Sequence, residues 1–140
     1  MLSQELVVPI QTPEPVISNK DLKTVAFKLQ SSFLGKIKGL CKSGYYASLS
    51  EVARIAVFEF MAELLTLREQ GGKFWNEFYN KDENIEKKVP ISVKIPIAML
   101  DNMNRIIQDF QFRDRSKFIR SALSRFIKED QDNYLNFLNK

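Results

Sequence analysis

The stretch Pro90-Ile91-Ser92-Val93-Lys94-Ile95 alternates between large apolar residues and small or basic ones. The stretch Thr24-Val25-Ala26-Phe27-Lys28-Leu29 does the same, and Thr24 and Pro90 lie 66 positions apart. A period of two places three large apolar side chains on one face of a strand and leaves the other face to the remaining residues. We therefore predict two short strands, each buried on one face only.

Helical periodicity follows each of these strands. Apolar residues stand at i, i+1, i+4, i+7 and i+8 within 33–41 and again within 99–107, which is one face of a helix. After a short turn, a second apolar stripe runs through 52–64, and its counterpart runs through 118–127. The sequence thus predicts two units, each built of one strand and two helices.

Residues that favour helix ends stand at the boundaries of these stripes. Ser48 with Glu51 three positions later forms a capping box, and Asp114 takes the equivalent position in the second unit. The first helix of the first unit has Ser31 or Ser32 as its expected cap and Gly44 at its expected end.

The two units are an internal repeat. Residues 25–62 align with residues 91–128 without a gap, and apolar residues coincide at 15 positions although few residues are identical. A unit of about 40 residues with one apolar sheet face and two apolar helix stripes cannot bury them alone. The units must therefore pair, within one chain or between chains, and we favour pairing within the chain.

The pattern divides the chain into five segments. An extended N-terminal arm with three prolines covers 1–19, the first unit covers 20–65, and a linker covers 66–87. The second unit covers 88–130, and a C-terminal helical extension covers 131–140. The linker is expected to hold a short aromatic helix that packs on the paired units or binds a partner, and its stripe consists of Phe74, Trp75, Phe78 and Tyr79.

The composition excludes several kinds of site. The 140 residues hold no histidine and one cysteine, Cys41, so no catalytic triad, Cys–His pair or histidine-containing zinc site is possible. One cysteine forms no intrachain disulfide, and Cys41 falls on an apolar helical stripe as a core thiol. No apolar run is long enough to span a membrane, and the first residues show no basic region followed by an apolar run, so we do not expect secretion. We expect an intracellular protein, cytoplasmic or in a host cell, that is not an enzyme and takes neither cofactor nor small-molecule substrate.

The positive charge is concentrated in the two units. The chain has 21 basic and 17 acidic residues, but 20–65 holds seven basic against four acidic ones and 87–130 holds ten against five. A concentrated positive face attracts polyanions and releases counterions condensed on them. Solvated surface lysines are the alternative explanation of the same charge.

Three stretches together resemble the ribbon-helix-helix family of DNA-binding regulators, which includes the MetJ, Arc and CopG repressors. They are Ile91–Pro96, Arg115–Arg120 and Gly44–Arg54. The resemblance implies a mainly α fold with a short antiparallel two-stranded ribbon, which enters the major groove of double-stranded DNA. Two copies in one chain imply a tandem ribbon-helix-helix pseudo-dimer, similar to regulators encoded by some archaeal viruses.

The resemblance, combined with the strand alternation, nominates two sets of DNA-contacting residues. The outward face of the ribbon would contact bases. This face has few long polar side chains, so DNA shape or side-by-side binding of several copies along the duplex would add specificity. The start of the second helix in each unit would contact phosphates. The base-contacting set is Thr24, Ala26, Lys28, Pro90, Ser92 and Lys94, and the phosphate-contacting set is Lys23, Leu49, Ser50, Arg115, Ser116 and Lys117.

The function implied is a transcriptional regulator, a repressor that occupies a promoter. A plasmid-partition or antitoxin protein would use the same surface, and a protein–protein assembly module would keep the fold without DNA contacts.

Arg54 and Arg120 are expected to pair with carboxylates. The aromatic residues expected in the core are Phe27, Phe33, Phe60, Phe112, Phe118 and Phe126.

Overall fold

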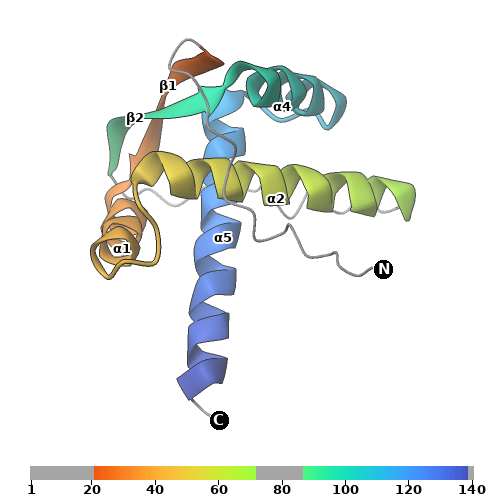
Figure 1. Cartoon of the computed structure of the whole chain (residues 1–140). Helices are drawn as coiled ribbons and strands as arrows, with labels where there is room; N and C mark the ends of the chain where they lie inside the picture. The colour runs from red at the N-terminus through yellow and green to blue at the C-terminus, as the bar shows by residue number, and fades with distance from the viewer. Residues whose placement is uncertain (1–20, 72–86, 139–140) are drawn as a thin grey trace, which may run out of the picture.

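The structure, a computed structural model, describes residues 21–71 and 87–138. This described part is mainly helical with a two-stranded antiparallel sheet, which confirms the predicted class. The arm 1–19 and the expected aromatic helix of the linker lie outside the described residues. In chain order the elements are β1 (Leu22–Gln30), α1 (Ser31–Lys42), α2 (Leu49–Glu69), β2 (Lys88–Pro96), α4 (Ile97–Asp109) and α5 (Arg115–Leu138) (Figure 1).

The elements occur twice in the same order and at a constant spacing. β1 and β2, α1 and α4, and α2 and α5 each begin 66 positions apart, which is the offset of the sequence repeat. Helix α4 has 13 residues and α1 has 12, so the turn before α5 is one residue shorter than the turn before α2. The shorter turn compensates for the longer helix, so α2 and α5 begin at equivalent positions of the repeat.

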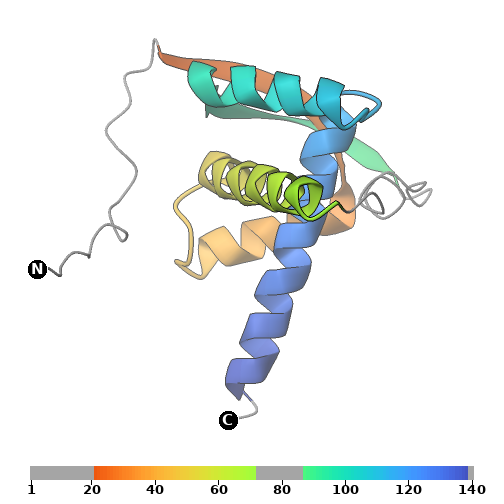
Figure 2. The same cartoon turned by 90° about the vertical axis from the view of Figure 1, so that its right-hand side faces the viewer.

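The two strands pair with each other within the one chain. β1 runs antiparallel to β2, and Ala26 lies opposite Ser92, two residues that are themselves 66 positions apart. The register is consequently symmetric about this pair. The helices interlock in the same way, because α2 packs beneath β2 and α5 packs beneath β1. Figures 1 and 2 show both strands at one end of the molecule, with α1, α2 and most of α5 below them.

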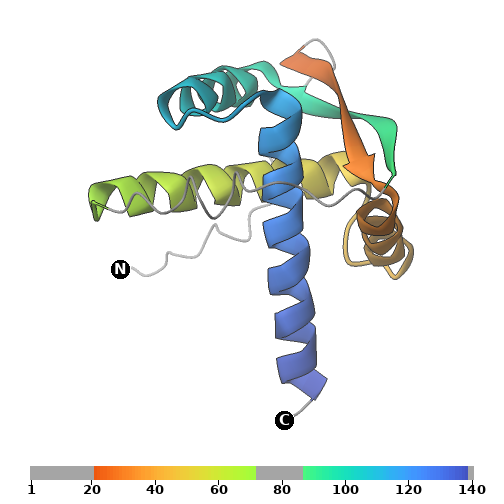
Figure 3. The same cartoon turned by 180° about the vertical axis from the view of Figure 1, so that it is seen from behind.

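Helices α2 and α5 cross beneath the ribbon. They make the most extensive helix–helix contact of the described residues, and Figure 3 shows the crossing from behind. Helix α5 continues to Leu138, so residues 131–138 are helical, as predicted for the C-terminal extension. Its last turns extend beyond the other described elements (Figures 1 and 3).

The inward face of the ribbon is part of the core. Phe27 is 3% exposed and Val93 is 1% exposed, whereas the residues between the buried positions are exposed. This confirms the predicted alternation. Each buried side chain of this size contributes roughly 1.5–3 kcal/mol to folding. The buried apolar residues of the ribbon are Val25, Phe27, Leu29, Val93 and Ile95.

Aromatic rings from both units fill the centre of the core. Phe60 of α2 lies 5.1 Å from Phe118 of α5, and Phe118 lies 5.0 Å from Phe112, between ring centroids. These three were expected in the core, as was Phe33. The structure leaves Phe33, in the first turn of α1, only half-buried, and the Lys36 ammonium lies 5.9 Å from its ring centroid.

The caps of the second helices follow the sequence. The Glu51 N–H donates to Ser48 Oγ at 3.1 Å, and the Ala47 N–H donates to Glu51 Oε1 at 2.6 Å, which completes the capping box. In the second unit the Lys117 N–H donates to Asp114 Oδ1 at 2.8 Å. Both predicted caps are confirmed.

The caps of the first helices differ from the prediction. Neither Ser31 nor Ser32 caps α1, because the helix begins directly after β1 with Gln30 as its N-cap residue and no side-chain cap. Gln30 adopts φ −58° and ψ 136°, close to the −58° and 142° of Pro96 at the equivalent position. A buried glutamine thus takes the backbone conformation that proline favours. Gly44, with φ +90°, follows the end of α1 as predicted.

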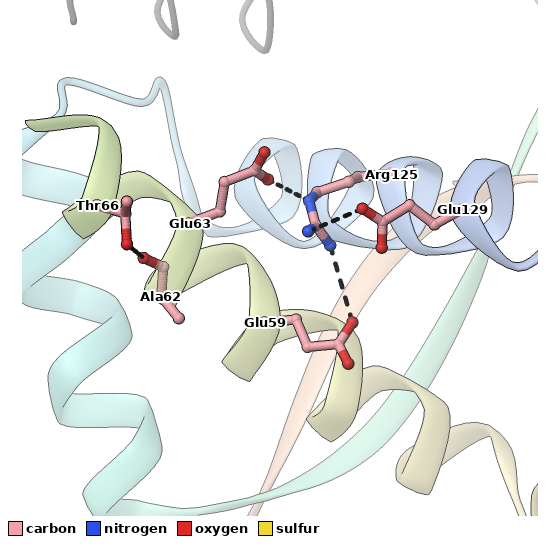
Figure 4. A network of polar contacts seen from close by, with 6 residues as sticks. All are labelled: Glu59, Ala62, Glu63, Thr66, Arg125 and Glu129. Atoms are coloured by element: carbon pink, nitrogen blue, oxygen red, sulfur yellow. Dashed lines mark hydrogen bonds and ion pairs between the residues drawn. The ribbon is translucent and has the colours of Figure 1, made fainter. Parts of the chain in front are cut away.

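A cluster of ionic groups joins α2 to α5 where they cross. Arg125 of α5 contacts Glu63 and Glu59 of α2, the latter at 3.8 Å, and Glu129 one turn along its own helix at 3.1 Å (Figure 4). The Arg125 side chain is only 16% exposed. Burial raises the pKa of the Glu59 carboxyl, Arg125 opposes this rise, and Glu129 adds to it.

Glu59 and Arg125 occupy equivalent positions of the repeat, 66 residues apart. If two copies of the first unit paired with each other in the same geometry, Glu59 would face another Glu59. The pairing of unlike units instead places a carboxylate opposite a guanidinium. The ionic cluster therefore favours association of the first unit with the second.

We expect Arg125→Ala to lower the free energy of unfolding by about 2 kcal/mol. The substitution leaves partly buried carboxylates without their shared cation, and such a loss costs more than the loss of an exposed pair. Chemical denaturation at neutral pH measures the change.

Arg68→Ala is the control, because Arg68 and Asp109 are both 54% exposed and their pair is worth about 1 kcal/mol or less. Equal losses for the two variants would contradict a special role for the Arg125 cluster.

Candidate nucleic-acid interface

The outward face of the ribbon is a narrow strip of exposed side chains. The cross-strand pairs on this face are Thr24 with Lys94, Ala26 with Ser92, and Lys28 with Pro90. All six residues are exposed. The structure thus brings the complete base-contacting set of the sequence analysis together on one face.

The two lysines lie at opposite ends of this strip. Lys28 is on β1 and Lys94 is on β2, and Lys94 pairs with Thr24, four residues before Lys28. At about 3.4 Å per residue, four residues span about 14 Å. This length corresponds to about four base-pair steps of B-form DNA.

Each edge of the ribbon is held by an arginine from the other unit. Arg54 of α2 donates to the Lys94 carbonyl at 3.0 Å, and Arg120 of α5 donates to the Lys28 carbonyl at 3.1 Å. The two bonds are equivalent under the repeat. Both strands of a two-stranded sheet have an unpaired edge, and these guanidinium groups satisfy carbonyls on each. The expectation that Arg54 and Arg120 act through carboxylates missed this backbone role.

The first turns of α2 and α5 lie at opposite edges of the ribbon. The Lys94 N–H donates to Ser50 Oγ at 2.9 Å, which attaches α2 to the β2 edge. Ser116 lies with Lys28 in the lining of one groove, which places the start of α5 at the β1 edge. The N–H groups of a first helical turn have no acceptor within the helix. Each edge of the ribbon is therefore flanked by amide donors, those of Leu49 and Ser50 on one side and those of Arg115 and Ser116 on the other.

Two residues of the predicted phosphate-contacting set do not lie as expected. The Lys117 side chain is 5% exposed, so it is not a solvent-facing cation, and its backbone N–H is used in the cap of α5. Lys23 is exposed, but it alternates in register with Val25 and so belongs to the opposite face from Lys28. Lys117 was predicted to contact a phosphate because it stands at the start of the second helix, and its burial is a result of tertiary packing that this position does not specify. Of the other four, Arg115 is exposed, and Leu49, Ser50 and Ser116 are half-buried.

A groove of about 760 Å³ lies between the Lys28 end of the ribbon and the start of α5. Two of its cations, Lys88 and Arg113, belong to neither predicted set of DNA-contacting residues. Lys88 opens β2, and Arg113 directly precedes the cap residue Asp114. The position of a basic residue at the start of a predicted strand, and of another directly before a predicted helix cap, was the sequence signal that could have indicated both. The polar side chains lining the groove are Lys28, Lys88, Arg113, Asp114, Ser116 and Arg120.

Asp114 is the acidic member of this groove. Burial alone would raise the pKa of its carboxyl, but the hydrogen bond from the Lys117 N–H and the nearby Arg113 and Arg120 guanidinium groups outweigh burial and hold the pKa below its ordinary value of 3.8. Arg113 Nε lies 3.3 Å from Asp114 Oδ2. The carboxylate therefore stays ionised at neutral pH and partly offsets the positive charge around it.

Comparison with models of known protein families finds no match, and comparisons with curated proteins and with solved structures find none either. Among the described residues, no cluster of three or more His, Cys, Asp or Glu side chains is placed to hold a metal ion. Within 21–71 and 87–138, no helix combines the length and apolar character that crossing a membrane requires.

We expect Asp114→Ala to lower the free energy of unfolding by about 1 kcal/mol at pH 7, because the Lys117 N–H loses its cap acceptor. The pKa of Asp114 is lower in the folded chain, so its contribution is complete above the ordinary value of 3.8 and is lost as the pH falls through the folded-state pKa. The difference between the two proteins should shrink below about pH 4. Denaturation at a series of pH values measures it.

Asp114→Asn is the matched control, since asparagine also caps helices. It should keep most of the stability at pH 7 without the acid-dependent component. If Asp114→Ala were as stable as the unaltered chain throughout, the cap would not contribute.

Proposed function

We propose that this chain is a double-stranded DNA-binding transcriptional regulator of the ribbon-helix-helix type, acting as a repressor. Its two strand–helix–helix units form a pseudo-dimer within one polypeptide. The β1–β2 ribbon enters the major groove with its outward face against the base edges. The observation that carries the proposal is the exposed strip of small and basic side chains on a ribbon whose other face is buried.

The dimensions of the ribbon support this proposal. The major groove is about 12 Å wide and admits a two-stranded β-ribbon. Ala26 and Ser92 at the centre of the strip are small, so the backbone can approach the base edges closely. Lys28 and Lys94 then reach guanine O6 and N7 atoms on either side, while Thr24 and Ser92 hydroxyls contact donors or acceptors.

The flanks of the ribbon support it as well. Sugar–phosphate backbones border the major groove on both sides, and the first turns of α2 and α5 border the ribbon on both sides. Backbone N–H groups at helix starts bind phosphate oxygens. Contacts of this kind set the register of a protein on DNA, and contacts to base edges set its sequence preference.

The substitution of both ribbon lysines tests the proposal. We expect Lys28→Ala with Lys94→Ala to weaken duplex binding about a hundredfold or more, at about 1–3 kcal/mol for each lysine–base contact. Both side chains are exposed, so the free energy of unfolding should change by less than about 0.5 kcal/mol. A titration of labelled duplex at several salt concentrations, with parallel denaturation, measures both quantities.

The control is Lys38→Ala with Lys42→Ala, which removes the same charge from the exposed face of α1. Unchanged affinity in the ribbon variant would show that the ribbon does not contact bases. Negligible binding of the unaltered chain at low salt would contradict a DNA-binding function altogether.

One observation favours a protein–protein assembly module as the second candidate. A largely apolar groove of about 660 Å³ runs between α2 and α4. Phe58 on its wall is 62% exposed and Leu65 is 37% exposed. Exposed apolar surface of this kind is typical of interaction sites. Sedimentation without DNA separates the candidates, because an assembly module would associate in the absence of duplex.

A further inference from the structure

We propose that the two ends of the ribbon have different tasks on DNA: the Lys28 end holds the phosphate backbone, and the Lys94 end discriminates bases. The inference rests on the proposed function and goes beyond it, because it predicts an unsymmetrical binding sequence. It follows from comparing the two ends of a ribbon whose register is symmetric about Ala26 and Ser92.

The Lys28 end is strongly basic. Lys88 and Arg113 line the groove there together with Lys28 and Arg120, and Lys87 and Arg115 are their exposed neighbours in sequence. Asp114 is the acidic side chain among them. A groove lined by several cations beside a DNA-facing strip attracts a phosphate, and the attraction does not depend on base sequence.

At the Lys94 end, Lys94 and Arg54 are the equivalents of Lys28 and Arg120, but the other cations have no basic equivalent. Moving back by 66 residues replaces Lys87 with Asp21, and Lys88 with Leu22. The same shift replaces Arg113 with Ala47, and Arg115 with Leu49. Four basic residues thus correspond to three apolar residues and one acidic residue. Lys23 also lies at this end of the ribbon, but its side chain belongs to the face that the helices cover and not to the DNA-facing strip.

The base-facing residues differ in the opposite sense. At the Lys94 end the cross-strand partner is Thr24, whose hydroxyl donates and accepts hydrogen bonds. At the Lys28 end the partner is Pro90, which has no polar side-chain atom and no N–H. Each end has one lysine, so the additional hydrogen-bonding capacity toward bases lies at the Lys94 end. Base information is therefore concentrated where backbone attraction is weakest.

Selection of bound sequences from a random duplex pool, with the full chain, tests the asymmetry directly. We expect a non-palindromic sequence whose informative positions cluster on one side of the centre. A palindromic sequence with equal information on both sides would overturn the inference and leave the proposed function standing. Failure to recover any bound duplex would contradict the proposed function itself.

Two variants separate the tasks. Lys88→Gln with Arg113→Gln should weaken binding to every sequence alike and make the plot of log affinity against log salt shallower by about 1.8, or about 0.9 per lost phosphate contact. Thr24→Ala should leave that slope unchanged and relax the preference at one base position about tenfold. Lys38→Gln with Lys42→Gln is the charge-matched control and should change neither quantity.

The readouts distinguish the possible outcomes. An unchanged salt slope for the Lys88 and Arg113 variant would show that the groove holds no phosphate. An altered base preference in that variant, or an unaltered one in Thr24→Ala, would show that the ends do not divide the tasks. Each of these results would overturn the inference, and denaturation of each variant verifies that it is folded.

Discussion

The structure depends on burying one face of a two-stranded ribbon against helices from both halves of the chain. A sheet of two strands is marginally stable by itself. Here Val25, Phe27 and Leu29 of β1 and Val93 and Ile95 of β2 are covered by α2 and α5. Because α2 packs beneath β2 and α5 beneath β1, neither unit is complete without the other. At the ribbon edges, an arginine of each unit also donates a hydrogen bond to a strand carbonyl of the other unit, that of Lys28 or Lys94.

Burial of one ribbon face leaves the other face available. The side chains on that face make little contribution to stability, so their identity is open to selection for binding. The same hydrogen bonds that cover the ribbon edges place a helix start on each side of it. The contacts that hold the ribbon in place therefore also position the surface that we propose to bind DNA.

A repeat within one chain removes a restriction that applies to symmetric dimers. In a homodimer, equivalent positions hold the same residue, and a self-facing glutamate would be repulsive. In this chain, Glu59 meets Arg125 at equivalent positions of the two crossing helices. The same freedom allows one end of the ribbon to have basic residues at four positions, 87, 88, 113 and 115, whose equivalents at the other end are not basic, although the backbone register of the two ends is symmetric.

The periodicities of the chain determined its elements, their order and their buried faces, because alternation by two and recurrence at helical spacing are local consequences of strand and helix geometry. They also determined the caps at Ser48 and Asp114, which depend on residues three positions apart. Only the tertiary structure decided that β1 pairs with β2 of the same chain, that Lys117 is buried, and that Arg54 and Arg120 reach across to backbone carbonyls. Likewise, Lys88 and Arg113 form one groove with Lys28 only after folding. These features join residues that lie between 25 and 92 positions apart, and no local pattern specifies which distant groups a folded chain brings together.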